Sequence, residues 1–543
     1  MQKQYFNNPF SETIFKTKYA NGPNDTWGNL AERVVEDVCG TRNNKYISLM
    51  SIEDRQQLAE YIKDFKFLPG GRYLWYAGRK NHYYNNCYLL RAEEDTREEW
   101  ASLTQRAVSC LMTGGGIGID YSVLRPSGKP LSRTGGLSSG PIPLMQMINE
   151  VGRGVMQGGS RRSAIYASLN WQHEDIEDFL NAKNWSPLLR ELKEKDFNFP
   201  APLDMTNISV NYDDKWGFDF NNPVFLANVK QAMKTGEPGF SFNFGEKQNE
   251  TLRNACTEVT SEDDSDVCNL GSINISNIKD LEEFKSVTEL AAKFLICGSL
   301  RADLPYEKIY RVREKNRRIG LGLMGIHAWL LQRGYKYEVV PELHQWLKVY
   351  KHESERAANE HCNRLYISQP IAYRAIAPTG TIGILAGTTT GIEPLFAVAY
   401  KRRYLTDGTK WKYEFVVDTT ADLLIKQYSI NPNDIETAYG LSKDYEKRIK
   451  FQADIQDYID MSISSTINLP QWGSKGNNES DITRFAKILG NYASRLRGFT
   501  CYPDGSRGGQ PLTEIDYYEA TKHKGITYEE NVERACTTGV CGI

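Results

Sequence analysis

The sequence predicts an α/β fold preceded by a small helical N-terminal region. Apolar residues recur every three to four positions in the first part of the chain, which is the spacing of amphipathic helices. From Asn86 onward, short apolar segments rich in β-formers alternate with helical stretches of moderate length. At 543 residues, the chain is long enough for three or four domains of roughly 150 residues, or for one α/β barrel with additional parts.

The N-terminal region contains two predicted helices. Asp25 and Thr26 can cap the first, in which Leu30, Val34 and Val38 recur every four residues. Residues 52–65 form the second candidate. We divide the chain into a helical region over 1–80, a catalytic domain over 81–515 and a flexible C-terminal tail over 516–543.

A run of glycines from Gly114 to Gly118 comes next. It follows a helix-compatible stretch over residues 100–112, which is the wrong order for a dinucleotide-binding fingerprint, because that motif needs a strand before it and a helix after it. We therefore interpret these glycines as a tight passage from a helix to a strand.

Two further glycine-rich loops are candidates for binding phosphate. In residues 158–164, Gly-Gly-Ser-Arg-Arg-Ser-Ala, two arginines can hold a phosphate or a base edge, although an exposed basic turn has the same composition. Residues 377–391 offer small residues and threonine hydroxyls, and a following helix would add its N-terminal dipole. This second loop lacks the lysine of a Walker motif, and a structural turn remains the alternative.

The candidate catalytic centre is Asn254-Ala255-Cys256-Thr257-Glu258, followed by Cys268. If this segment is extended, the amide, the thiol and the carboxyl point the same way, because strand side chains alternate with period two. An oxidisable sulfur, a general base and a hydrogen-bonding amide would then converge on one target, with Cys268 as a redox partner. The alternative is a buried structural cysteine beside a solvated acidic loop.

The ten cysteines and seven histidines show no spacing typical of a metal site, so we expect no bound metal. The N-terminus has no secretory profile, which favours a reducing, cytoplasmic location without structural disulfides. Cys536 and Cys541 lie near the C-terminus with Gly539 between them. They can close into a disulfide, or they can be incidental thiols of a frayed tail.

Charge and hydropathy exclude two classes of partner. The net charge of −2 gives no electrostatic reason to expect binding of polymeric nucleic acid. No apolar run approaches the roughly 20 residues needed to cross a bilayer, so we expect no membrane association.

Taken together, the motifs resemble those of ribonucleotide reductases from about Leu68 to the last residue. No single motif is decisive, but their joint order is specific. In order they are Asn86-Cys87, the triple glycine, residues 158–164, residues 254–258, Cys268-Asn269-Leu270, Lys315-Asn316-Arg317-Arg318-Ile319-Gly320, Pro378-Thr379-Gly380-Thr381 and the terminal cysteine pair.

The resemblance implies a ten-stranded α/β barrel, made of two five-stranded parallel halves, with the cysteine motif on a central finger loop. It implies that Cys256 becomes the thiyl radical that abstracts the 3′ hydrogen of a ribonucleotide. Glu258 would take the proton of the 3′ hydroxyl, and Asn254 would hold the ribose hydroxyls. Cys87 and Cys268 would protonate the departing 2′ hydroxyl and deliver two electrons. The substrate would be held by Asn86, Pro378, Thr379, Gly380 and Thr381.

The resemblance also bears on the source of the radical. Family members fed by a separate metallo-subunit carry two adjacent tyrosines near the C-terminal side of the barrel, whereas this chain has Cys501-Tyr502 there. This favours the adenosylcobalamin-dependent class. A catalytic subunit that receives its radical from a metallo-subunit is the alternative. Ala255 and Thr257 stand where the cobalamin class usually has proline and glycine.

Partners follow from the same resemblance. Cys536 and Cys541 would carry electrons from a thioredoxin- or glutaredoxin-like reductant to the active site. Gly159, Ser160, Arg161 and Arg162 resemble the loop that relays dNTP or ATP effectors to substrate choice. We expect no ATP cone, and we expect a homodimer, because residues 121–140 leave no room for the insertion that replaces the partner in monomeric enzymes. Diphosphate and triphosphate substrates both remain open.

Overall fold

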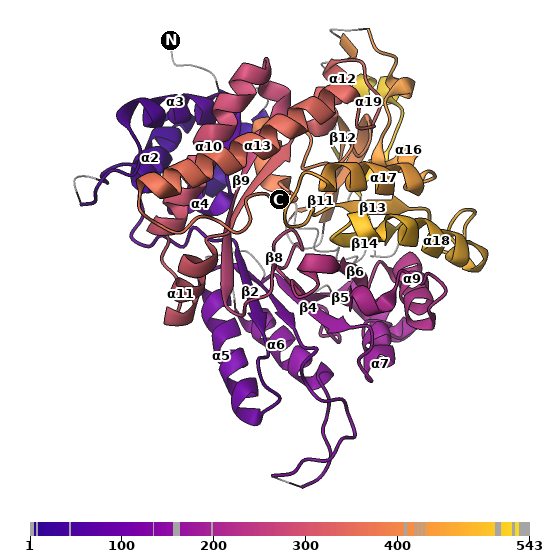
Figure 1. Ribbon diagram of the computed structural model, residues 1–543. Helices are drawn as coiled ribbons and strands as arrows, with labels where there is room; N and C mark the ends of the chain where they lie inside the picture. Colours follow the sequence, from indigo (N-terminus) through magenta and orange to yellow (C-terminus); the bar gives the residue numbers. More distant parts are fainter. Residues whose placement is uncertain are drawn as a thin grey trace.

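A barrel of strands with helices on its outside forms the centre of the molecule (Figure 1). The computed structural model describes residues 5–6, 9–42, 45–133, 135–155, 163–196, 199–406, 410–418, 421–422, 425–426, 429–504, 512–523 and 527–530. The chain passes through an N-terminal helical region, two half-barrels and a small antiparallel sheet.

The first half-barrel consists of five parallel strands joined by helical crossovers. The strands pair in chain order: β2 (Cys87–Arg91), β3 (Gly116–Asp120), β4 (Ile165–Asn170), β5 (Thr206–Tyr212) and β6 (Gly239–Phe242). The crossovers contain α5 (Arg97–Met112), α6 (Ile142–Gly154), α7 (Ile176–Asn181), α8 (Pro187–Lys195) and α9 (Pro223–Thr235). These strands are buried almost throughout, as expected when helices cover a parallel sheet.

The second half-barrel repeats this plan with longer helices. Its strands are β9 (Asp266–Asn274), β10 (Ile319–Met324), β13 (Thr466–Leu469) and β14 (Gly498–Pro503), with parallel pairing of β9 to β10 and of β13 to β14. Residues 372–376 fill the gap between the two pairs through parallel bridges of Leu321 with Arg374 and of Ile376 with Ile463. Its helices are α10 (Leu281–Arg301), α11 (Glu307–Asn316), α12 (Ile326–Gln332), α13 (Pro341–Arg364), α14 (Gly380–Ala386), α16 (Ala438–Leu441), α17 (Tyr445–Gln456) and α18 (Ile482–Tyr492).

The two halves meet along two antiparallel seams, β2 with β9 and β6 with β14. A short strand, β1 (Phe67–Pro69), adds to β9 in antiparallel orientation. The sheet contains ten strands, and this arrangement confirms the predicted α/β barrel of two parallel halves.

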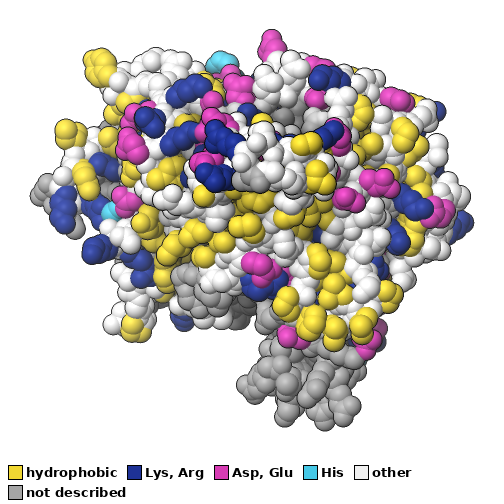
Figure 2. Space-filling model, turned by 90° about the horizontal axis from the view of Figure 1, so that it is seen from below, with side chains coloured by type: hydrophobic (Ala, Val, Ile, Leu, Met, Phe, Trp, Pro, Cys, Tyr) yellow, Lys and Arg dark blue, Asp and Glu magenta, His cyan; other side chains and the backbone are white. Residues whose placement is uncertain are grey.

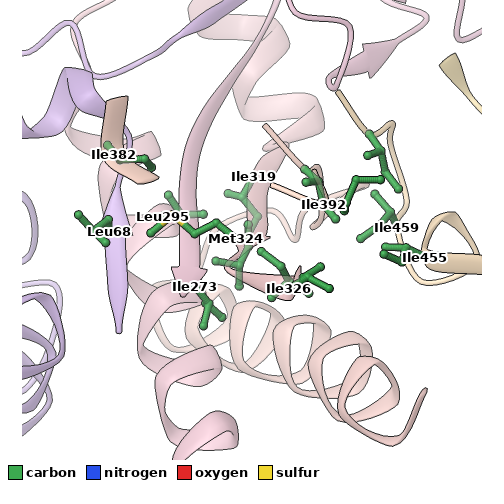
Figure 3. Packing of buried hydrophobic residues seen from close by; sticks show 14 of the residues in the cluster. Leu68, Ile273, Leu295, Ile319, Met324, Ile326, Ile382, Ile392, Ile455 and Ile459 are labelled. Atoms are coloured by element: carbon green, nitrogen blue, oxygen red, sulfur yellow. The ribbon is translucent and has the colours of Figure 1, made fainter. Parts of the chain in front are cut away.

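Apolar side chains from the second half-barrel pack against its covering helices (Figure 3). Ile273 on β9 and Ile319 and Met324 on β10 are fully buried, as is Leu295 on α10. Burial of each such side chain contributes about 1.5–3 kcal/mol relative to exposure. The position of β9, which carries Cys268, is therefore fixed by a well-filled core.

The N-terminal region is helical, as predicted. It contains α1 (Pro9–Ile14), a π-helix (Phe15–Tyr19), α2 (Trp27–Cys39), α3 (Ile52–Lys63) and α4 (Gly71–Tyr76). The Thr26 hydroxyl accepts a hydrogen bond from the Asn29 amide at 3.1 Å and caps α2. Helix α3 ends before the predicted residue 65, because Phe65 adopts a left-handed conformation with φ of 54°.

A second sheet is antiparallel throughout and combines two strands inserted within the second half-barrel with two strands that follow it. Its order is β15 (Leu512–Glu514), β11 (Ala399–Thr406), β12 (Lys410–Val417) and β16 (Thr527–Glu530), with α19 (Tyr517–Lys522) between its last two strands in sequence. The sequence analysis did not predict this sheet. The domain boundaries at residues 80 and 515 stay predictions.

The surface is mixed in charge. Figure 2 shows Lys and Arg side chains interspersed with Asp and Glu on one face, with hydrophobic side chains gathered between them. Such a face has no single-sign field of the kind that attracts a polyanion. Within the described residues, every helix is too short or too polar to span a bilayer.

Candidate active site

A finger loop runs between the two half-barrels and carries the predicted catalytic motif. It follows β6 and contains a two-stranded hairpin of β7 (Leu252–Arg253) and β8 (Thr260–Ser261). The loop packs directly on β3. A Cβ atom on Gly118 would lie 1.7 Å from the Arg253 carbonyl oxygen, and one on Gly116 would lie 3.0 Å from Cβ of Ala255. The glycines of β3 therefore make room for the finger loop.

The tip of the finger loop is a tight turn, so the predicted extended conformation of residues 254–258 is wrong. The Thr257 amide donates to the Asn254 carbonyl at 3.0 Å, and Thr257 has a positive φ of 70°. The Asn254 side chain accepts from the Val259 amide at 2.9 Å and closes the turn. The chain must reverse here to form the hairpin, and an extended segment would leave these groups unbonded. Asn254 and Glu258 are consequently buried, whereas Cys256 is exposed.

Cys87 and Cys268 face each other across the seam between the half-barrels. They are direct partners in the antiparallel pairing of β2 with β9, which sets their Cα atoms about 4.5–5.5 Å apart. Disulfides need about 4.4–6.8 Å between Cα atoms. Both side chains are buried and neither is disulfide-bonded. The pair is thus placed to close one disulfide without movement of the strands.

The finger loop and the cysteine pair are in contact. The Asn254 amide nitrogen lies 3.0 Å from Cys87 Sγ, and that thiol lies 3.9 Å from Glu258 Oε1. Cys256 is close enough to raise the pKa of the Cys87 thiol electrostatically. All five predicted catalytic residues, Asn254, Cys256, Glu258, Cys87 and Cys268, therefore converge on one site.

Burial controls the protonation of these groups. It raises the pKa of the Cys87 and Cys268 thiols well above the usual range, and the nearby carboxylates Glu258 and Asp266, respectively, raise them further. Both sulfurs stay protonated at neutral pH as a result. Burial also raises the pKa of Glu258 to about 7, against the lowering effect of its hydrogen bonds with Asn254 and Cys87.

A carboxyl group with a pKa near 7 can accept or donate a proton at neutral pH, which suits a general acid–base catalyst. Glu258 Oε2 is buried and has no hydrogen-bond partner within the described part of the chain. Burying a carboxylate oxygen without a hydrogen bond costs free energy unless a ligand donates a hydrogen bond to it. We therefore regard Oε2 as the atom of Glu258 that faces a substrate.

An ionic network that the sequence analysis missed holds the base of the finger loop. Glu250 lies 2.9 Å from Arg497 and 3.4 Å from Arg318, and their positive charges overcome burial and lower the pKa of Glu250 to about 2. Arg318 also pairs with Asp266 on β9 at 2.8 Å. Arg253, fully buried, donates to Asn243 Oδ1 at 2.7 Å and to the Arg497 carbonyl at 3.0 Å. Arg318 lay in a motif noted from the sequence, whereas Glu250 and Arg253 did not.

The candidate phosphate loop borders the same site. Ala377, which precedes Pro378, shares an apolar cluster with Cys87 and Cys268. Thr379 has a left-handed φ of 52°, and its hydroxyl accepts from the Gly391 amide at 2.8 Å. The helix that was expected to follow residues 377–391 instead lies within them, because α14 begins at Gly380 and ends at Ala386.

The other predicted substrate residues differ in exposure. Pro378 is exposed and Thr381 half-buried, whereas Asn86, directly before β2, has a buried Oδ1 that lacks a partner among the described residues. Gly159, Ser160, Arg161, Arg162, Cys536 and Cys541 lie outside the described residues.

Comparison with known proteins identifies the family. A sequence model described as the barrel domain of ribonucleotide reductase matches residues 85–196, 224–347 and 371–493, more than half of the chain. The chain belongs to the ribonucleotide reductase family. The matched residues include Cys87, Cys268 and the entire finger loop.

Relatives of this reductase family cover nearly the whole chain. A protein of Mycobacterium tuberculosis (strain CDC 1551 / Oshkosh), named vitamin B12-dependent ribonucleoside-diphosphate reductase, is 26% identical over 90% of this chain and 78% of the relative. A Mycobacterium phage D29 protein, named as an adenosylcobalamin-dependent ribonucleoside-triphosphate reductase, is 24% identical over 98% of this chain and 99% of the relative.

The fold is shared with a solved structure as well. A crystal structure of a B12-dependent (class II) ribonucleotide reductase superposes with a TM-score of 0.70 and covers 94% of this chain and 93% of the solved one. Its sequence is 17% identical.

Proposed function

We propose that this protein reduces ribonucleotides to 2′-deoxyribonucleotides by thiyl-radical chemistry, with adenosylcobalamin as the source of the radical. The observation that carries the proposal is the placement of exposed Cys256 beside Glu258 and the directly opposed pair Cys87 and Cys268. The relatives named as cobalamin-dependent align with 90% and 98% of this chain, which favours this class over a subunit fed by a metallo-protein.

The residues present fit adenosylcobalamin. Cys256 is the exposed member of an otherwise buried site, so a bulky group can approach its sulfur. Cys501 on β14 is buried in the core. It stands where family members that receive their radical from a separate metallo-subunit have a tyrosine. When bound, adenosylcobalamin supplies the radical that removes a hydrogen atom from a thiol.

Each residue then has a role set by its position. The Cys256 sulfur takes the hydrogen atom from the 3′ carbon of the ribose and later returns one. Glu258 accepts the proton of the 3′ hydroxyl, helped by its pKa of about 7. The Asn254 amide, held by the Val259 amide, orients the ribose hydroxyls.

The cysteine pair supplies the electrons. The carbon–oxygen bond at the 2′ position breaks, and the departing hydroxyl leaves as water with a proton from one thiol. The two thiols together give two electrons and two protons and become one disulfide. Because Cys87 and Cys268 are opposed on paired strands, this bond forms within the existing geometry.

The substrate phosphates are assigned to residues 378–381, next to the N-terminus of α14. Asn86, with its unpaired Oδ1, is assigned to the sugar side. Named relatives include both a diphosphate and a triphosphate reductase, so both substrate types belong in the assay.

The test is an assay of the isolated chain with adenosylcobalamin, a dithiol reductant and either ribonucleoside diphosphates or triphosphates. We expect deoxyribonucleotide without any second protein. Cys256→Ser should abolish product, whereas Cys362→Ser, the same change at a buried cysteine of α13, should retain it. Activity that requires a metallo-subunit would establish the alternative class instead.

The proposal also covers the reduction of the active-site disulfide and the regulation by nucleotide effectors. We assign Cys536 and Cys541 to thiol exchange with the active-site disulfide, followed by reduction by a thioredoxin- or glutaredoxin-like protein. Residues 159–162 are assigned to dNTP or ATP effectors. Because the catalytic thiols must be reduced between turnovers, we place the enzyme in the cytoplasm.

We assign homodimer formation to the outer surface of α5 and α6. Met112 on α5 is 72% exposed and Met147 on α6 is 50% exposed, and the two helices pack against each other. Exposed methionines on two helices that pack together suit a protein–protein contact.

The dimer is tested by light scattering with dATP or dTTP present. Met112→Glu with Met147→Glu should yield monomers, whereas Tyr439→Glu, at an equally exposed position on α16, should leave the dimer intact. A monomeric wild-type chain would contradict the assignment.

A further inference from the structure

A second charged cavity lies at the base of the finger loop, away from the cysteine site. It has a volume of about 290 Å³. Its walls come from the segments directly before β13 and β14, together with Lys247 before β7 and Lys351 on α13. The lining residues are Lys247, Lys351, Gln456, Asp457, Ile459, Asp460, Ser494, Arg495, Leu496 and Arg497.

This cavity is distinct from the candidate phosphate loop. Asp460 and Arg497 precede the strands of the second half-barrel, whereas Pro378 follows the strand-like residues 372–376. Because these strands run parallel, the two places lie at opposite ends of the half-barrel. A ligand in one does not occupy the other.

The carboxylates that line the cavity are already paired. Asp457 lies 2.6 Å from Arg495, and Asp460 lies 2.7 Å from Arg374. Arg497 is paired with Glu250 at 2.9 Å. Among the described residues, no carboxylate lies within ion-pair distance of the ammonium groups of Lys247 and Lys351. The cavity therefore has two ammonium groups outside any ion pair of the described residues, although Glu250 and Asp460 raise the pKa of Lys247 against the effects of burial and of Arg497.

Lys247 is the more constrained of the two lysines. Its ammonium group donates to the Asp460 carbonyl, which also accepts from Arg497 at 3.4 Å. Burial lowers the pKa of Lys247, and the positive charge of Arg497 lowers it further. Two cations that share one carbonyl are stabilised when an anion joins them.

Gln456 supplies an acceptor at the same place. Its side-chain nitrogen donates to the carbonyls of Ile459 and Met461, at 3.1 and 2.9 Å, which fixes the orientation of the amide. Its Oε1 has no partner within the described residues, and the side chain is 6% exposed. A buried acceptor beside cations fits an oxyanion that carries a hydroxyl group, such as monohydrogen phosphate.

We infer that this cavity binds a phosphate group between Lys247, Lys351 and Gln456. The site does not depend on the reductase activity proposed above. It adjoins the finger loop, since the Arg497 carbonyl accepts from Arg253 and the Arg497 side chain pairs with Glu250. A bound phosphate would therefore stiffen the base of the loop that carries Cys256.

The test is calorimetric titration of the full chain with inorganic phosphate at constant ionic strength. Lys247→Met with Lys351→Met should weaken one class of binding at least tenfold. Lys285→Met removes an exposed lysine of α10 that does not line the cavity, and it should bind as the wild type does. Thr381→Val, in the first turn of α14, should leave this class intact.

Two results would overturn the inference. One is phosphate binding by the double variant that equals that of the wild type. The other is a loss of binding confined to Thr381→Val, which would assign all phosphate binding to the loop at 378–381. If the double variant has a lowered melting temperature, the single variants Lys247→Arg and Lys247→Met are compared instead. Lys247→Arg keeps the charge and should retain the affinity for phosphate within about threefold, whereas Lys247→Met should not.

Discussion

At the residue scale, the chemistry depends on how Glu258 is held. Its carboxyl group is buried, receives contacts from Asn254 and Cys87, and keeps one oxygen without a partner in the described structure. The same burial that makes Glu258 a base at neutral pH keeps the thiols beside it protonated. One environment thus prepares a proton acceptor and two hydrogen donors together.

The first prediction concerns the activity of Glu258→Gln. The amide cannot accept the 3′ hydroxyl proton, so turnover should fall by roughly 10²–10⁴. In the wild type, the base must be deprotonated, and activity should therefore fall as the pH drops through about 7. Initial rates between pH 5.5 and 8.5 measure this. A pH profile that is the same in both proteins would contradict the role of Glu258.

The second prediction concerns stability at the same residue. Because the folded-state pKa of Glu258 is raised to about 7, its contribution to stability is full below the unfolded pKa and is lost as the pH rises through 7. The loss amounts to about 3 kcal/mol. Glu258→Gln lacks this loss, so its melting temperature should rise relative to that of the wild type from pH 5 to about pH 7 and stay level relative to it at higher pH. A constant difference across that range would argue against a raised pKa.

Residue chemistry was the part most accessible from the sequence. The joint order of the motifs resembles ribonucleotide reductases, and this resemblance implied the roles of Asn254, Cys256 and Glu258. Their conformation was not accessible: alternation suggested a strand, whereas the hairpin required a turn with Thr257 at positive φ. Glu250 gave no signal, since its arginine partners lie far away in sequence.

At the scale of elements, the finger loop and β3 are matched surfaces. Gly118 has the least room of the β3 glycines, with the Arg253 carbonyl where its Cβ would be. The sequence analysis interpreted residues 114–118 as a passage from helix to strand. Gly114, with φ of 86°, serves that purpose. Gly116 and Gly118 lie within β3, where the finger loop, more than 130 residues later in the sequence, leaves little or no room for a side chain.

The third prediction follows from this fit. Gly118→Ala should displace the finger loop, reduce turnover at least 100-fold and destabilise the protein by about 1–3 kcal/mol. Gly154→Ala is the matched control, because no atom lies within 4 Å of its Cβ position and alanine favours a helix. Turnover and thermal melting of both variants measure the effect. Full activity of Gly118→Ala would show that the loop does not need this contact.

At the scale of the whole molecule, the site exists only because two half-barrels meet. Cys87 belongs to the first half, Cys268 to the second, and the finger loop connects them. Alternating strands and helices predicted the α/β class, since each crossover has local sequence signals, and the family resemblance predicted the barrel. The antiparallel sheet of β11, β12, β15 and β16 was not predicted, because two of its strands come from beyond the barrel and short strands carry weak patterns.

The fourth prediction concerns electron supply to the whole enzyme. Replacing both Cys536 and Cys541 with serine should preserve one turnover by the pre-reduced enzyme, since Cys87 and Cys268 hold two electrons. It should abolish repeated turnover driven by thioredoxin, because a bulky reductant cannot reach buried sulfurs. Rapid-quench and steady-state assays separate these phases. An unchanged steady-state rate in the double variant would refute the shuttle.

Because Cys87 and Cys268 lie on the antiparallel seam, their oxidation would also change how the two half-barrels are connected. When the two thiols are oxidised, a disulfide cross-links one half-barrel to the other and closes a loop between residues 87 and 268. A cross-link that closes a loop of this length lowers the conformational entropy of the unfolded chain. This stabilises the folded state by about 5 kcal/mol. In the proposed cycle we therefore expect a reduced form that accepts substrate and an oxidised, cross-linked form that resists heat and proteolysis better until it is reduced.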